Sequence, residues 1–335
     1  MKALVTGAGG FLGGAVAGLL LDRGHQVRGF SRGDYPALRA RGASFERGDI
    51  ADAGAVQRAA AGCDIVFHCA AKAGVWGPYE EYRSANIEGT RNVLAACRAH
   101  GIRKLVYTSS PSVVFDGRDA DGIDESAPYP KRFDSHYSAT KAVAEEMVLA
   151  ADGPQLATVA LRPHLLWGPG DTQITPRIVA KARAGVLRRI ETGRKLVDTT
   201  YISDAAEAHL LAAERLTPGA SCAGKAYFIS SGDPRPIWEI IDLILGAAGL
   251  PPVQKTISPR AALAGAAVLE AVHRILRLPG EPRLTRFMVL QLSTAHWFNI
   301  AAARRDLGYE PKVRVEEGIE RLREWFINER EGGRN

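Results

Sequence analysis

The sequence predicts an α/β protein, built on a doubly wound parallel sheet and completed by a smaller, mostly helical C-terminal lobe. Three observations support this fold class. Short, continuously apolar segments alternate with helical segments through the first half of the chain, as in parallel sheets covered on both faces. A glycine-rich turn directly follows the first apolar segment. After Pro163 the alternation becomes irregular, and from about Pro234 the pattern is mostly helical with repeated breaks.

Each strand is expected from a short apolar run bounded by glycine or polar residues. The expected strands span residues 2–7, 25–32, 43–52, 63–71, 102–110 and 156–163, with a further strand at 224–232. Helices are expected at 11–24, 81–101 and 135–150, and the first two end at a glycine. Beyond Pro163 we expect a loop at 167–176, a helix at 177–190, and a strand and helix within 196–216.

The composition is that of a soluble globular protein, with 46% hydrophobic and 24% charged residues. The net charge of +6 fits an anionic ligand, but no Lys/Arg block is present, so nucleic-acid binding is not expected. The four cysteines lack a CxxC pair and the eight histidines lack metal-binding spacing. We therefore expect reduced, buried thiols, no metal site and a cytoplasmic location. No uncharged apolar run reaches the roughly 18 residues of a membrane span.

The first chemical motif is VTGAGGFLGG, in which Gly7, Gly10 and Gly13 form GxxGxxG between a strand and a helix. This is not the GxGxxG spacing of the common dinucleotide fingerprint, but the physical logic is the same. The turn brings the backbone close to a pyrophosphate, which the unpaired N–H groups and the dipole of the helix N-terminus stabilise. Phe11 and Leu12 lie in the same turn and are included in the predicted cofactor site.

The end of the second strand predicts which dinucleotide binds. An acidic residue there would bind the ribose hydroxyls of NAD, but this strand ends with Ser31 and Arg32. A hydroxyl and a guanidinium suit a 2′-phosphate, so we predict NADP(H). Asp49, followed by Ile50, ends the third strand, where the carboxylate could accept from the adenine amino group. A helix N-cap is an equally good interpretation for Asp49 or Asp52.

These motifs place a dinucleotide-binding domain, of the Rossmann type, over residues 1–165. We expect residues 195–232 to return to it. The substrate lobe is then assembled from residues 166–194 and 233–335.

Hydroxyl groups and a Tyr–Lys pair are expected at the ligand-binding edge of this sheet. Thr108, Ser109 and Ser110 end the fifth strand, where doubly wound sheets bind their ligands. Tyr137 and Lys141 are four residues apart and share one face of the following helix. An ammonium one turn away favours the phenolate, whose pKa is otherwise near 10.

The order of glycine turn, strand-end hydroxyls and YxxxK resembles the short-chain dehydrogenase/reductase superfamily in its extended form. The resemblance spans the whole chain and includes TGAGGFLG, GDI, HCAA, SANIEGTRNVL, YTSS, YSATK and LRPHLLWGPG. It implies that Tyr137 exchanges a proton with the substrate carbonyl oxygen and that Ser110, or alternatively Ser109, hydrogen-bonds the same oxygen. Lys141 would hold the nicotinamide ribose and lower the phenol pKa.

The same resemblance implies roles for four further residues. Ala70, within HCAA, and Pro163 would contact the cofactor. Asn86 occupies the position of an asparagine that structures the site, and His164 would lie near the nicotinamide. Asn86 and His164 are also candidate substrate residues.

Several activities remain open within the superfamily. Dehydratases carry an Asp-Glu pair after the strand-end hydroxyl, where this chain has Pro111 and Ser112, so dehydration is excluded. Nucleotide-sugar epimerases and the 3β-hydroxysteroid dehydrogenase-like branch both remain. The C-terminal half is similar to the latter, with two apolar helices around a proline-rich break and the stretch ARRDLGYEP. A non-enzymatic NADP-binding redox sensor is a further alternative.

Residues 261–278 form an apolar helix with Leu263, Ala267, Ala271 and Ile275 at helical spacing. Core packing, a lid over an acyl or sterol chain, and an interfacial helix with Arg274 and Arg277 near lipid headgroups all fit this pattern.

Within that branch, stretches such as LATVALRPHLLWGPGD and GKAYFISSGDP are similar to bacterial 2-alkyl-3-oxoalkanoate reductases of long-chain olefin biosynthesis. This implies NADPH-dependent reduction of a long-chain β-keto acid. It also implies a complex with a β-lactone synthetase and an α/β-hydrolase-type decarboxylase. His164, Arg177 and Lys195 are candidates for the substrate carboxylate. Family members often dimerise through two helices, here those starting near Glu80 and Tyr137.

Overall fold

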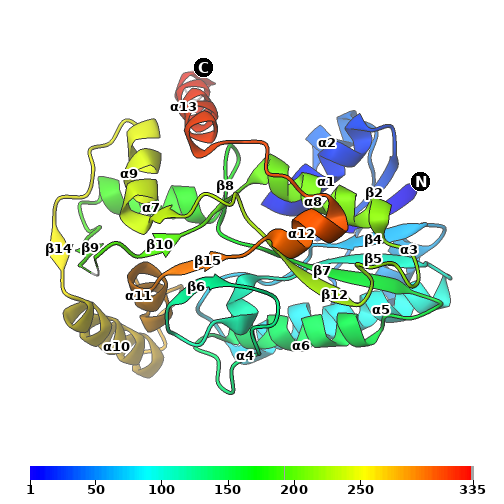
Figure 1. The fold of residues 1–335 in the computed structure, drawn as a ribbon, viewed down its shortest axis with the longest axis horizontal. Coiled ribbons are helices and arrows are strands. Elements are labelled where there is room, and N and C mark those ends of the chain that lie inside the picture. The colour runs from blue at the N-terminus through cyan, green and yellow to red at the C-terminus, as the bar shows by residue number, and fades with distance from the viewer. Residues whose placement is uncertain (192, 333–335) are drawn as a thin grey trace.

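The computed structural model describes residues 1–191 and 193–332. Thr192 and residues 333–335, which fall within the predicted substrate lobe, lie outside the described residues. The centre of the protein is a seven-stranded, all-parallel sheet in the order β12-β7-β5-β4-β1-β2-β3 (Figure 1). Its strands are β1 Lys2–Thr6, β2 Gln26–Ser31, β3 Ser44–Arg47, β4 Ile65–His68, β5 Lys104–Thr108, β7 Ala157–Pro163 and β12 Lys225–Ile229. The predicted Rossmann-type doubly wound fold is confirmed.

Helices cover both faces of this sheet (Figure 1). Helices α1 (Phe11–Asp22) and α8 (Ile202–Arg215) lie on one face, and α3 (Ala53–Ala60), α5 (Gly89–Ala99) and α6 (His136–Ala150) on the other. Successive side chains of a strand point to opposite faces. Accordingly, Ala3 and Val5 join one buried apolar cluster and Leu4 joins the other. The strand order reverses between β1 and β4, which is where sheets of this kind bind their ligands.

The predicted helix 81–101 is interrupted. It consists of α4 (Tyr79–Tyr82), a π-helical turn η1 (Arg83–Glu88) and α5. Single π-helical turns inside α-helices are frequent at functional sites. Here the turn carries Asn86, whose side chain binds the backbone of the loop after β4.

The predicted boundaries of the helix at 177–190 were wrong at both ends. The loop ends earlier than expected, and α7 spans Ile174–Arg183, because the Asp171 carboxylate accepts hydrogen bonds from the N–H groups that open the helix. Residues predicted to end that helix form β9 (Arg189–Ile190), which pairs with β14 (Thr256–Ile257).

The smaller lobe contains α9 (Ile237–Ala247), α10 (Pro259–Ile275) and α11 (Arg286–Ser293). It also holds a four-stranded sheet in the order β13-β10-β15-β6. The strands are β13 Arg235–Pro236, β10 Leu196–Val197, β15 His296–Phe298 and β6 Ala120–Ile123. Because β6 pairs with β15, a segment from the first half of the chain extends into this small sheet. Strand β12, from the second half of the chain, pairs with β7 in the large sheet. The predicted domain boundaries stay a prediction.

Shorter elements join the two parts. Strand β8 (Leu166–Trp167) pairs with β11 (Thr200–Tyr201). Helix α12 (Ala301–Leu307) packs on α8 and β12, and α13 (Val315–Gly332) packs on α9. Helix α2 (Pro36–Ala40) follows β2, and a short 3₁₀ turn, η2 (Pro111–Val114), follows β5. Among the described helices, none is both long and apolar enough to cross a bilayer.

Candidate active site

The predicted hydroxyl and Tyr–Lys groups meet at the carboxyl end of β5. Helix α6 is capped by Ser135, whose hydroxyl accepts from Ser138 N at 3.1 Å, and it packs against η2 and β7. Tyr137 and Lys141 therefore lie on its first two turns, next to the residues that follow β5.

The structure brings Ser110, and not Ser109, into contact with Tyr137. A hydrogen bond with Ser110 lowers the pKa of the Tyr137 phenol, but burial raises this pKa more, so the net shift is upward. The Ser110 hydroxyl also accepts from Ser112 N at 3.2 Å and donates to Ser112 Oγ at 3.0 Å. The Ser109 hydroxyl is buried and has no hydrogen-bond partner among the described residues.

Lys141 is buried, and its Nζ donates to the Thr108 carbonyl at 2.5 Å and lies 4.0 Å from the centre of the Tyr107 ring. Burial lowers the pKa of Lys141 to about 7. The expected lowering of the Tyr137 pKa by Lys141 is not found, because burial sets the phenol pKa and Lys141 contacts Thr108 and Tyr107 instead. The phenol is thus protonated at neutral pH, which is the form that donates a proton.

Glu145 is a site-supporting residue that the motifs did not identify. It lies four residues after Lys141 and is fully buried. Its carboxylate accepts from Arg162 Nη2 at 2.6 Å and from the Tyr129 hydroxyl at 2.6 Å. Its charge raises the Lys141 pKa and so opposes the effect of burial. The signal in the sequence is an acidic residue that continues the i, i+4 spacing of Tyr137 and Lys141 within an apolar stretch.

The turn between β1 and α1 has the shape that a pyrophosphate requires. Gly7 has φ +69°, and a Cβ there would lie 2.8 Å from the Ala70 backbone; one at Gly13 would lie 2.2 Å from the Gly7 carbonyl oxygen. Gly10 caps α1 without a side-chain hydrogen bond, so no side chain occupies the N–H groups of the first turn. Leu12 is buried in the core, so only its backbone could reach a cofactor.

Replacing Gly13 by alanine is expected to weaken cofactor binding by about tenfold or more, or ~1.4 kcal/mol. The added Cβ would collide with the Gly7 carbonyl oxygen and displace the turn. The measurement is the Kd for NADPH by fluorescence titration. Gly153→Ala is the control, since a Cβ at Gly153 meets nothing within 4 Å. Equal Kd values for both variants would show that the turn does not hold the cofactor.

The ends of β2 and β3 lie beside this turn, since Gly7 N donates to Phe30 O at 2.8 Å. Arg32 is exposed there, and Arg47 Nε donates to its carbonyl at 2.8 Å. Of the two candidate caps of α3, Asp52 is the one that accepts from the helix, at 3.1 Å from Ala55 N.

Three other predicted cofactor residues lie at the same edge. Asp49 is exposed and accepts from Ala51 N at 2.9 Å. Ile50 is buried in the core cluster. The Ser31 hydroxyl donates to Gly33 O at 3.3 Å.

Asn86 holds the site together through its amide. It accepts from Lys72 N at 2.7 Å and donates to Thr140 Oγ1 at 2.9 Å, which ties the loop after β4 to the first turns of α6. Its neighbour Thr90 contacts His68 at 3.0 Å, and burial lowers the His68 pKa to about 3. The structure gives Asn86 a positioning role, and its contact with substrate stays a prediction.

Each of the three candidates for the substrate carboxylate already contacts another side chain. His164 follows Pro163 at the end of β7, is buried, and contacts His296 Nδ1 through Nε2 at 2.7 Å. Burial holds the pKa of His164 well below its ordinary value, so the ring is neutral. Arg177 pairs with Glu281 at 3.1 Å, and Lys195 pairs with Asp119 at 2.5 Å.

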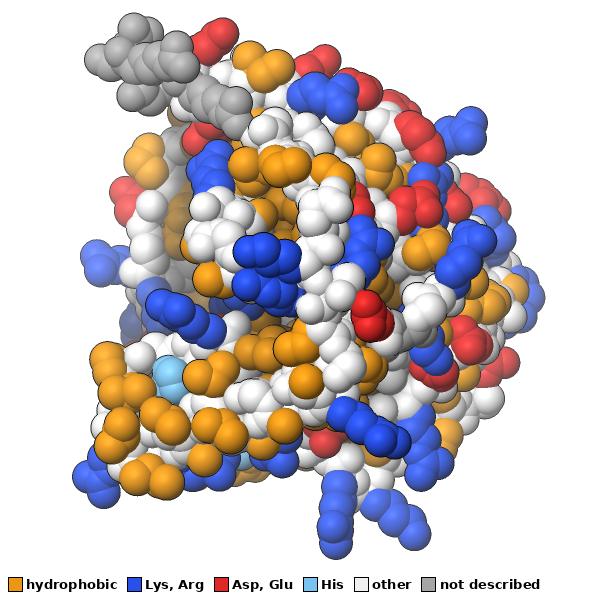
Figure 2. Space-filling model, turned by 90° about the vertical axis from the view of Figure 1, so that its left-hand side faces the viewer, with side chains coloured by type: hydrophobic (Ala, Val, Ile, Leu, Met, Phe, Trp, Pro, Cys, Tyr) orange, Lys and Arg blue, Asp and Glu red, His pale blue; other side chains and the backbone are white. Residues whose placement is uncertain are grey.

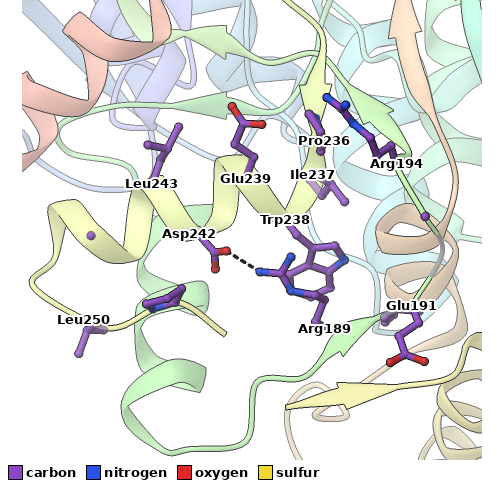
Figure 3. A pocket seen from close by; sticks show the side chains of 14 residues that line it. Arg189, Glu191, Arg194, Pro236, Ile237, Trp238, Glu239, Asp242, Leu243 and Leu250 are labelled. Atoms are coloured by element: carbon purple, nitrogen blue, oxygen red, sulfur yellow. Dashed lines mark hydrogen bonds and ion pairs between the residues drawn. The ribbon is translucent and has the colours of Figure 1, made fainter. Parts of the chain in front are cut away.

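A cavity of about 730 Å³ lies between β9 and α9, and it is not the reaction site (Figure 3). Arg189 lies over the Trp238 ring there and pairs with Asp242 at 2.5 Å. None of Ser110, Tyr137 and Lys141 lines this cavity.

A parallel sheet with a glycine turn and a Ser–Tyr–Lys group at its carboxyl edge defines an NAD(P)-dependent oxidoreductase of the short-chain dehydrogenase/reductase class. Within this class, the chain belongs to the 3-beta hydroxysteroid dehydrogenase/isomerase family, whose sequence profile matches residues 4–260. It therefore acts on CH–OH or keto groups.

Two relatives that match this chain over nearly its whole length are both named 2-alkyl-3-oxoalkanoate reductase. The chain is 54% identical over 326 residues to a 2-alkyl-3-oxoalkanoate reductase of Stenotrophomonas maltophilia, covering 96% of this chain and 98% of the relative. It is 48% identical to the reductase of that name from Shewanella oneidensis, covering 96% and 85%. A 3-beta-hydroxysteroid dehydrogenase of Mycolicibacterium neoaurum is 36% identical, covering 95% and 89%.

Solved structures show the same fold. A short-chain dehydrogenase/reductase superfamily protein from Agrobacterium tumefaciens with bound NAD has a TM-score of 0.75 at 23% identity, with 100% of both chains covered. UDP-glucuronic acid 4-epimerase from Bacillus cereus, in complex with NAD, has a TM-score of 0.72 at 23% identity, covering 98% of this chain and 99% of the other.

Proposed function

We propose that the protein reduces the 3-keto group of a long-chain 2-alkyl-3-oxoalkanoic acid to the 3-hydroxy acid with NADPH, as a step in olefin hydrocarbon biosynthesis. The observation that carries the proposal is the Ser110–Tyr137–Lys141 group. The chain that holds this group is 54% and 48% identical to two relatives named 2-alkyl-3-oxoalkanoate reductase.

Tyr137, Ser110 and Lys141 would each have a separate role in the reduction. NADPH, when bound, supplies the hydride to the carbonyl carbon. Tyr137 donates its phenolic proton to the carbonyl oxygen, and the upward shift of its pKa keeps that proton in place at neutral pH. Ser110 donates a hydrogen bond to the same oxygen as negative charge develops on it. Lys141 would exchange its contact with Thr108 for the nicotinamide ribose.

The test of substrate class is a side-by-side assay of NADPH oxidation with a 2-alkyl-3-keto acid, a 3-ketosteroid and UDP-galactose. We expect turnover with the keto acid. Turnover only with the steroid would favour a 3β-hydroxysteroid dehydrogenase, and sugar conversion alone would favour an epimerase. Cofactor binding without any turnover would favour a redox sensor.

Arg32→Asp should reverse the cofactor preference from NADPH to NADH. The exposed guanidinium at the end of β2 would pair with the 2′-phosphate, and a carboxylate would repel it. We expect the ratio of kcat/KM for NADPH to that for NADH to fall by about a hundredfold, or ~2.7 kcal/mol. Arg41→Asp is the control, because Arg41 pairs with Asp22 at the opposite end of α1. A wild-type preference for NADH would contradict the assignment.

The resemblance supports further proposals on assembly and location. We propose a cytoplasmic enzyme that acts with a β-lactone synthetase and an α/β-hydrolase-type decarboxylase. A homodimer would pair α4, α5 and α6, on which Tyr79 and Val143 are exposed.

A further inference from the structure

Helix α10 carries an exposed apolar face. Half of the ten exposed large hydrophobic residues of the described chain lie in or just after this helix. Their exposed fractions are 62% for Val268, 38% for Val272, 77% for Ile275, 63% for Leu276 and 41% for Leu278. Figure 2 shows apolar side chains gathered along the lower part of this side of the molecule, with Lys and Arg side chains at the margin.

This face is distinct from the one that packs on the protein. The buried side of α10 consists of Ala262, Ala266 and Glu270, and the Glu270 carboxylate accepts from Arg286 N and Nε at 2.7 and 2.8 Å. Val268, Val272 and Ile275 follow one another at i, i+4 and i+7 on the outer side. Core packing therefore does not explain the outer apolar residues.

The margin of this face is cationic. Residues 259–286 contain five arginines and two glutamates. Both glutamates are engaged, Glu270 with Arg286 and Glu281 with Arg177. The other four arginines have no ion pair among the described residues; these are Arg260, Arg274, Arg277 and Arg283.

The C-terminal end of α10 contacts the loop that follows β4. The Arg274 guanidinium lies over the Trp76 ring at 5.9 Å, and His273 meets the edge of the same ring at 6.3 Å. Trp76 belongs to the loop after β4 that Asn86 holds through Lys72. The exposed apolar face thus ends next to the loop that borders the candidate active site.

We propose that α10 docks the protein on an anionic lipid surface. Aliphatic side chains on one face with arginines beside them are the pattern of helices that lie in a bilayer interface. Docking would place the active site close to a long-chain substrate dissolved in the lipid. This delivery role rests on the proposed function, whereas the docking itself does not.

The experiment is co-sedimentation of the full chain with phosphatidylglycerol-containing vesicles and with pure phosphatidylcholine vesicles, without substrate or NADPH. We expect stronger binding to the anionic vesicles, weakened by salt. Ile275→Glu combined with Leu276→Glu should lower the partition coefficient by at least about tenfold. Ile327→Glu, at an exposed apolar position on α13, should bind as the wild type. Circular dichroism spectra of all variants should match that of the wild type, which shows that they fold.

Two results would overturn the proposal. The first is equal vesicle binding by the wild type and the double variant, or no binding by either. The second is a concentration-dependent dimer in analytical ultracentrifugation that the double variant abolishes, which would assign the face to a second copy. Because no turnover is involved, vesicle binding could persist even if the proposed substrate were wrong.

Discussion

Tyr137→Phe is expected to lower kcat for keto reduction by at least about a hundredfold, the lower range for general acid catalysis. The Tyr137 phenol is protonated at neutral pH and is hydrogen-bonded to Ser110. Phenylalanine keeps the ring and removes the proton. The measurement is kcat with saturating keto acid and NADPH, together with the Kd for NADPH, which should change little.

Three further variants make this result specific. Tyr79→Phe alters an exposed tyrosine on α4 and should leave kcat unchanged. Ser110→Ala should lower kcat by roughly a hundredfold, as for loss of one oxyanion donor. Ser109→Ala, which removes a hydroxyl without a hydrogen-bond partner among the described residues, should have little effect. A fully active Tyr137→Phe variant would remove Tyr137 from the mechanism.

Glu145→Ala is expected to destabilise the fold by about 3–5 kcal/mol, the cost of leaving a buried charge without its partner. The Arg162 guanidinium, with its side chain 4% exposed, would lose three hydrogen bonds to the carboxylate. The measurement is the free energy of unfolding from denaturant titration. The loss should also lower the pKa of Lys141 further, because the Glu145 charge raises it.

The neighbouring Glu146→Ala is the matched control, since Glu146 is exposed on the same helix. Replacing both partners, Glu145→Leu with Arg162→Met, should recover part of the stability because no unpaired charge stays buried. If Glu145→Ala is as stable as Glu146→Ala, water must reach Arg162 and the pair does not support α6.

The sheet, the glycine turn and the Tyr–Lys pair could be predicted because each depends on residues close together in the sequence. Apolar runs, glycines at a strand–helix junction and an i, i+4 spacing are local patterns. The start of α7 was predicted wrongly for a local reason, because the Asp171 carboxylate accepts hydrogen bonds from Gln173 N and Thr175 N and so begins the helix early. The π-helical turn at Asn86 has a long-range cause, since the Asn86 side chain bonds Lys72 and Thr140.

The amino-acid sequence by itself determined the fold class, the family and the order of the reacting groups, since chain-local patterns encode all three. Only the tertiary structure decided that Ser110 rather than Ser109 meets Tyr137, and that Lys141 contacts Thr108 and has a pKa of about 7. It also decided that His164 is bound by His296, 132 residues away, and that α10 exposes Ile275. The physical reason is that burial and hydrogen bonding depend on which elements pack together, and the same helical periodicity fits a buried face and an exposed one.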